Sequence, residues 1–157
     1  MPVETTAGST LSVCAGNPPT YDAAGYATLF GSSAEEFVGE ITDLGEFGRE
    51  YALNTHSPVA TRGTQKFKGS FNEGQLNLQL ALNTDDPGQI VMKQARDSDD
   101  PYSFKITMQG GDVYYFQALV MGFKVAPGSV DNIVSASSTM EITTNSAGVG
   151  IVESLAS

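Results

Sequence analysis

The chain lacks tryptophan and has one cysteine and one histidine among its 157 residues. A single cysteine, Cys14, excludes a disulfide within the chain, and we expect it to be a small buried hydrophobic residue. A zinc site would have to rely on carboxylates, because only His56 and Cys14 offer a nitrogen or sulfur ligand. We therefore expect no metal, no cofactor and no catalytic thiol.

Basic residues are also scarce. Eight Lys and Arg stand against 18 Asp and Glu, which gives a net charge of −10. This balance argues against a protein that binds nucleic acid or an anionic membrane, because both need clustered positive charge. An acidic surface repels DNA, so it still suits a protein that lies close to DNA without adhering to it. We find no secretory signal and no transmembrane helix in the pattern, and expect folding in a cytoplasm.

Motifs that carry chemistry are missing as well. Asp85 and Asp86 stand at an expected helix start, where acidic residues are common. The acidic stretch 97–100 lacks the glycine and the final glutamate of a standard calcium loop. The glycines form no phosphate-binding motif, and no elbow motif presents a serine nucleophile to His56. The sequence therefore favours a protein that is not an enzyme.

Alternating hydrophobic residues predict a mainly β (α+β) fold. The clearest strand is 75–82, where leucine alternates with polar residues or alanine. Asp86 and Pro87 fit the N-cap and first position of the one expected helix. The expected strands are 10–14, 37–44, 59–71, 75–82, 102–108, 112–124 and 132–144.

This pattern indicates a β-sandwich or small barrel with one packed α-helix, in a single domain spanning residues 1–157. Three segments fall outside it. We expect a flexible N-terminal arm at about 1–9, a long loop at 45–62 and a C-terminal arm at about 145–157. Residues 16–33 look irregular.

Several expected strands lack the features that protect a monomer. Strand 112–124 has apolar residues on both faces, so one face needs a cover from outside the core. Segments 69–82 and 132–144 contain few of the charges, prolines or bulges that shield sheet edges. Their outward residues are neutral and polar, as at Gln75, Asn77 and Gln79. We therefore expect a structural subunit that assembles with copies of itself.

The order of elements from Thr61 to Thr144 resembles the tail tube proteins (major tail proteins) of long-tailed, lambda-like bacteriophages. The similar features, in chain order, are Met1–Val3 followed by Gly8–Leu11, Gly63–Lys66 leading into a strand, strand 75–82, the helix after Asp86–Gln89, strand Tyr102–Ile106, strand Val113–Lys124 with Gly122–Phe123, and the closing strand through Ser138–Ile142.

The resemblance implies a virion tail protein, assembled in the cytoplasm of the host bacterium, whose hexameric rings stack into a tube. Genomic DNA would pass through the tube without specific binding, and no membrane would be involved. Its partners would be further copies of the chain and the tape measure, tail terminator and distal tail proteins. The C-terminal arm would lie over a neighbour.

Two sets of site residues follow from the resemblance. The long loop 45–62 would contact the adjacent ring through Glu46, Arg49, Glu50, Tyr51, His56 and Arg62. Acidic residues that could face the lumen are Glu40, Asp43, Asp131 and Glu141.

Three alternatives stay open. The chain could be a secreted β-barrel that binds a small ligand. It could also be the tube protein of a gene-transfer particle or a contractile injection particle, which has the same fold. Finally, the loop 45–62 could simply be solvated.

Overall fold

The computed structural model describes residues 3–31 and 35–155. Residues 1–2 and 156–157 of the expected arms lie outside this range. The described residues form, in order, β1 (Thr10–Cys14), α1 (Ala23–Phe30), β2 (Glu36–Val38), β3 (Ile41–Asp43), β4 (Glu50–His56), β5 (Gln65–Asn72), β6 (Gln75–Ala81), α2 (Pro87–Asp97), β7 (Tyr102–Thr107), β8 (Val113–Ala126), β9 (Ser135–Thr143) and β10 (Val152–Ser154).

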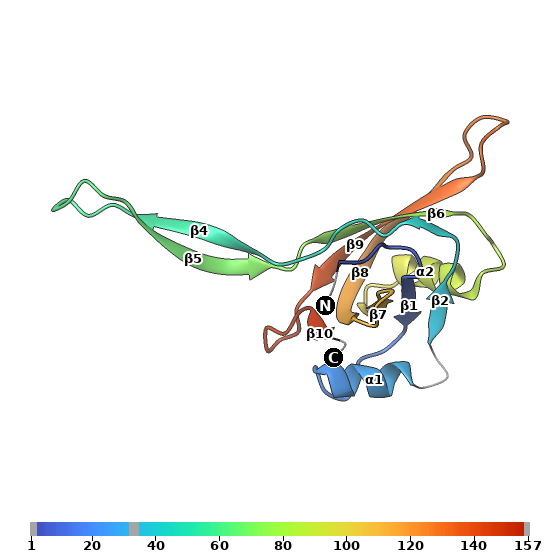
Figure 1. The fold of residues 1–157 in the computed structure, drawn as a ribbon, viewed down its shortest axis with the longest axis horizontal. Coiled ribbons are helices and arrows are strands. Elements are labelled where there is room, and N and C mark those ends of the chain that lie inside the picture. The colour runs from blue at the N-terminus through green and yellow to red at the C-terminus, as the bar shows by residue number, and fades with distance from the viewer. Residues whose placement is uncertain (1–2, 32–34, 156–157) are drawn as a thin grey trace.

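One large antiparallel sheet dominates the body, in the strand order β2-β1-β7-β8-β9-β6-β3, and β10 pairs with β8 beside it. The edge strands β2 and β3 follow each other in the chain but lie at opposite edges. Residues 36–43 therefore cross from one edge to the other, which requires a curled sheet. Glu40 makes the bend with a φ of 63°. The predicted mainly β fold is confirmed, with two helices among the described residues where one was expected (Figure 1).

Helix α2 packs against β8, β2 and β1 and begins where the sequence predicts. The Asp86 carboxylate caps it by accepting the Gln89 N–H, and also accepts the Gly39 N–H at the β2–β3 crossing. Met92 and Ala95 of α2 enter the core among leucines of β6 and aromatic residues of β7 and β8. Apolar burial on one face of the sheet is thus the main source of stability.

Gln89 ties α2 to the crossing. Its side chain is buried, and its amide nitrogen donates to the carbonyls of Gly39 (3.1 Å) and Ala81 (3.0 Å). Its amide oxygen accepts the Asn83 N–H at 3.0 Å. These bonds hold the helix to the segment that links the two edges of the sheet.

A second helix, α1, lies in the stretch 16–33 that was expected to be irregular. Asp22 caps it by accepting the Gly25 N–H at 2.7 Å. Tyr26 stacks on Tyr115 of β8, with ring centroids 5.3 Å apart. Cys14 is buried in the same small cluster, as predicted. The short helix covers part of the sheet face opposite α2. It is too short for its buried apolar residues to form a regular helical pattern in the sequence.

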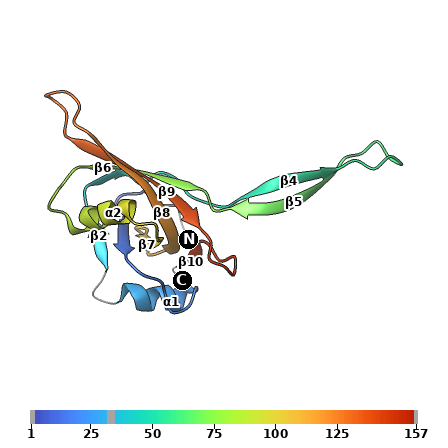
Figure 2. The same ribbon diagram turned by 180° about the vertical axis from the view of Figure 1, so that it is seen from behind.

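The long loop 45–62 contains a strand. Residues 50–56 form β4, which pairs with β5 from Glu50↔Asn72 to His56↔Gln65. The two strands form a separate two-stranded sheet that projects from the body (Figures 1 and 2). We call residues 50–72 the hairpin arm. The sequence concealed β4 because all seven of its residues are exposed and show no alternation of burial.

Other expectations are changed by the structure. The expected strand 37–44 is broken into β2 and β3, and the expected strand 59–71 begins only at Gln65. Strands β6 and β9, expected as unshielded edges, are interior strands of the sheet. Their neutral polar residues mark an uncovered face and not an open edge. The C-terminal segment 145–155 turns back on its own chain, where Asn145 accepts the Val149 N–H and β10 pairs with β8.

The substitution Gln89→Leu should lower the free energy of unfolding by at least about 2 kcal/mol, because it leaves buried main-chain groups without partners. Denaturant unfolding would measure the loss. Gln94 lies exposed on the same helix, so the matched control Gln94→Leu should change the free energy of unfolding by no more than about 0.5 kcal/mol. Equal midpoints for both variants would contradict the anchoring role of Gln89.

Candidate functional site

The one cysteine and the one histidine lie on separate parts of the fold. No group of three His, Cys, Asp or Glu side chains in it could hold a metal ion. Cys14 is buried in the body, whereas His56 is exposed at the outer end of β4. None of the described helices has the length and apolar character needed to cross a membrane. Three surfaces could bind other molecules: a polar sheet face, the hairpin arm and a groove.

The polar face is formed by neighbouring residues of β6 and β9. Gln75, Asn77 and Gln79 point away from the core, since they alternate with buried leucines. Asn77 lies opposite Thr139 and accepts a hydrogen bond from its hydroxyl at 3.3 Å. Residues directly opposite in a ladder share a face. The structure thus brings the two predicted polar rows into one surface.

The structure places two of the four acidic residues that could face the lumen on the polar face, and the other two elsewhere. Glu141 lies on the polar face, where it accepts a hydrogen bond from Gln75 at 2.9 Å. Asp43 stands opposite Gln79, which places it on the same face. Glu40 occupies the bend between β2 and β3, and Asp131 lies exposed between β8 and β9.

Lys124 of β8 also joins the polar face, because it pairs with Ser137 of β9. The two acids and this lysine leave the face with a slight negative charge.

Four of the six candidate contact residues lie on the hairpin arm. Glu50, Tyr51 and His56 belong to β4, and Arg62 lies in the turn between β4 and β5. All four are exposed. Glu46 is exposed in the extended segment before the arm. The arm therefore carries polar side chains away from the body, where they can reach a neighbour.

Arg49, the sixth candidate, fastens the base of the arm. Its Nε donates to the Glu73 carboxylate, and its guanidinium lies 4.0 Å from the centroid of the Phe71 ring. The hydrogen bond to Glu73 is the largest cause of the raised pKa of Arg49, and a hydrogen bond to Tyr51 is the next largest. The other Glu73 oxygen accepts the Ile151 N–H. Arg49 is thus engaged within its own chain.

Glu73 is a structural residue that the sequence did not reveal. It follows β5 directly and is 1% exposed. Gly150 packs so closely that a Cβ there would lie 2.4 Å from a Glu73 carboxylate oxygen. In the sequence, Glu73 is simply an acidic residue beside Gly74, and this pattern is equally typical of a solvent-exposed turn.

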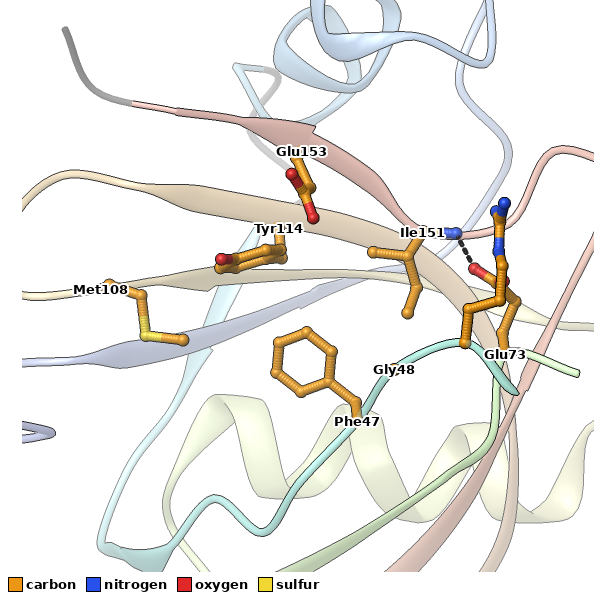
Figure 3. A pocket seen from close by; sticks show the side chains of 8 residues that line it. Phe47, Gly48, Glu73, Met108, Tyr114, Ile151 and Glu153 are labelled. Atoms are coloured by element: carbon orange, nitrogen blue, oxygen red, sulfur yellow. Dashed lines mark hydrogen bonds and ion pairs between the residues drawn. The ribbon is translucent and has the colours of Figure 1, made fainter. Parts of the chain in front are cut away.

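A groove of about 550 Å³ opens beside this base (Figure 3). Phe47, Met108, Tyr114 and Ile151 form its apolar lining, and Glu153 also lines it (Figure 3). Phe47 packs edge-on against Tyr114, with ring centroids 5.3 Å apart. The groove combines apolar walls with negative charge.

The charge at this groove affects Tyr114. Partial burial, together with the nearby charges of Glu153, Asp112 and Glu4, raises the pKa of its phenol. The phenol therefore stays neutral through the physiological range.

Comparisons with known proteins give structural likenesses only. No protein-family model matches this chain, and no curated protein sequence does. A chain in the cryo-EM structure of the anti-feeding prophage (AFP) baseplate, 6-fold symmetrised, is similar with a TM-score of 0.65 and 10% identity, over 90% of this chain and 93% of that one.

Two further solved structures are similar over most of this chain. One is the PVC sheath/tube terminator of an extracellular contractile injection system in the extended state, with a TM-score of 0.67 and 7% identity, over 99% of this chain and 98% of that one. The other is the SPP1 tail tube, with a TM-score of 0.61 and 12% identity, over 92% of this chain and 75% of that one. At such low identities the likeness is one of fold, and this chain shares that fold.

Proposed function

We propose that the chain is the structural subunit of a tube in a phage tail or a related injection particle. The observation that carries this proposal is the fold shared with chains in structures of a tail tube, a sheath/tube terminator and a baseplate, in each case over at least 90% of this chain. The role requires no catalysis. It requires surfaces that bind further copies of the chain.

In the proposed assembly, six copies form a ring and rings stack into a hollow tube of the lambda-like type. A ring contact closes on itself, whereas a stacking contact joins unlike surfaces and continues into a filament. The polar face of β6 and β9 would line the lumen. Most groups there are neutral amides and hydroxyls, and Asp43 and Glu141 repel phosphate, so the single Lys124 per copy is outweighed by acidic charge. Six copies at −10 each give a ring a formal charge of −60.

The hairpin arm would make the contact between rings. It extends from the body, and Tyr51, His56 and Arg62 are exposed along it. Partners at the ends of the tube would be terminator and distal tail proteins, with a tape measure protein inside. The tube would assemble in the host cytoplasm and become part of the virion tail.

A second candidate is the tube or terminator subunit of a contractile injection particle. Two of the structures described above, those of the AFP baseplate and the PVC sheath/tube terminator, favour it. The content of particles purified from the native host would distinguish the two. Packaged genomic DNA supports a phage tail, and DNA-free particles with a contractile sheath support the injection system.

Concentrated protein should form rings or tubes visible by negative-stain microscopy.

Replacing residues 57–64 with Asn-Gly should abolish stacking, because it removes the outer end of the arm. The two-residue turn suits the hairpin, since it joins the last pair, His56↔Gln65, directly. The shortened protein should remain folded by circular dichroism. Stacked tubes from the shortened protein would refute the role of the arm in stacking.

The substitution Glu141→Lys should make assembled tubes retain DNA, because it adds a ring of cations to the proposed lumen. Co-sedimentation of tubes with short labelled duplexes would measure this. Wild-type tubes and Asp99→Lys tubes should retain little DNA, since Asp99 is exposed beyond α2 and away from the polar face. Equal retention by both lysine variants would show that β9 does not line the lumen.

A further inference from the structure

Charge is distributed unevenly between the hairpin arm and the rest of the chain. The arm, residues 50–72, contains three basic residues (Arg62, Lys66 and Lys68) and one acidic residue, Glu50, at its base. Its formal charge is +2, which leaves −12 on the other residues of a chain with a total of −10. From residue 51 to 72 no acidic residue occurs. A cationic arm thus projects from an anionic body (Figure 2).

The arm also exposes large apolar side chains. Leu53 is 64% exposed, Phe67 is 55% exposed and Val59, in the turn, is fully exposed. Such a concentration on a thin projection marks a surface that binds protein. The fitting partner surface would be apolar and acidic.

The groove beside the base of the arm has both properties. Its walls are apolar, Glu153 lies exposed on β10, and Glu4 and Asp112 add negative charge around Tyr114. Among the described residues the only basic side chain lining it is Arg49, which is already bonded to Glu73. Glu153 therefore leaves the groove with a negative charge that an incoming cation can reach.

We infer that the outer part of the hairpin arm of one copy docks in the groove of a second copy. This inference rests on the proposed function and adds which surfaces meet. The arm cannot fold back into its own groove, because it leaves the body beside the groove and extends away for roughly 20 Å, at about 3.3 Å per residue. Donor and acceptor are different surfaces of one chain, so the contact is head-to-tail and can repeat.

Opposite charges attract at this contact, and salt weakens the attraction. Raising the ionic strength from about 0.1 M to about 1 M shortens the Debye length from about 10 Å to about 3 Å. Assembly of the wild-type protein should therefore require more protein at high salt. Salt-independent assembly would argue against docking driven by charge.

Charge reversal on each surface tests the pairing directly. Lys66→Glu changes the arm and Glu153→Lys changes the groove, and both side chains are exposed. Each variant alone should need at least about tenfold more protein to assemble than the wild type, because like charges now face each other. The control Arg96→Glu alters charge equally on α2, away from both surfaces, and should assemble like the wild type.

The decisive measurement is rescue. The double variant Lys66→Glu/Glu153→Lys, and an equimolar mixture of the two single variants, should both regain assembly near the wild-type concentration. Rescue in the mixture is specific to a contact between copies. Sedimentation velocity with negative-stain microscopy would follow assembly, and circular dichroism would verify folding.

The outcomes separate this inference from the proposed function. If the wild type forms rings or tubes and Lys66→Glu assembles as readily as Arg96→Glu, the docking assignment is wrong while the tube function stands. If both single variants fail without rescue, the arm and this groove do not meet. If the wild type never assembles, the proposed function itself fails. If Lys66→Glu assembles normally but loses binding to duplex DNA, the arm binds nucleic acid instead.

Discussion

The buried carboxylate of Glu73 joins the three segments that build the functional surfaces. It accepts hydrogen bonds from Arg49, where the arm begins, and from the Ile151 main chain, just before β10. It also lies at the end of β5, where the arm returns to the body. A buried acid is stable only when its oxygens are satisfied. The direction of the arm and the presence of the groove therefore depend on one another through this side chain.

The body and the arm rely on different physics. The body is stabilised by an apolar core between α2 and the curled sheet, and Gln89 and Asp86 join the helix to the crossing of the sheet edges. The arm has almost no core, since its strands are exposed on both faces apart from a few residues near its base. Evolution can therefore alter the charge and shape of the arm at little cost to the stability of the body. This separation suits the proposed role in contacts between copies.

The sequence predicted those parts of the fold in which burial alternates. Strand 75–82, the helix start at Asp86 and the β7–β8 hairpin were located because apolar periodicity and capping residues are local signals. Strand β4 was missed because nothing covers it, and α1 was missed because it is short and packs mainly through Tyr26 and Phe30. A strand exposed on both faces can still be predicted, as β5 was within the expected strand 59–71, but β4 and the two-turn helix α1 show no periodic pattern of apolar residues.

The functional surfaces were predictable only in part. The neutral rows of β6 and β9 were visible in the sequence, and their union into one face required only adjacent strands. The buried state of Glu73 depends on contacts with residues far along the chain, such as Ile151. The groove depends on the same distant contacts, since Phe47, Met108 and Ile151 come from three separate segments. Long-range proximity of this kind has no local signature.

The isolation of the arm has a kinetic consequence. A two-stranded hairpin without a core is marginally stable in water, so a free subunit spends time with its arm frayed. In the proposed assembly, each association must first order that arm, so a single encounter is brief. A growing tube end that offers several grooves at once binds an arriving subunit for longer. Growth should then show a lag before elongation, and adding preformed tube ends should shorten that lag.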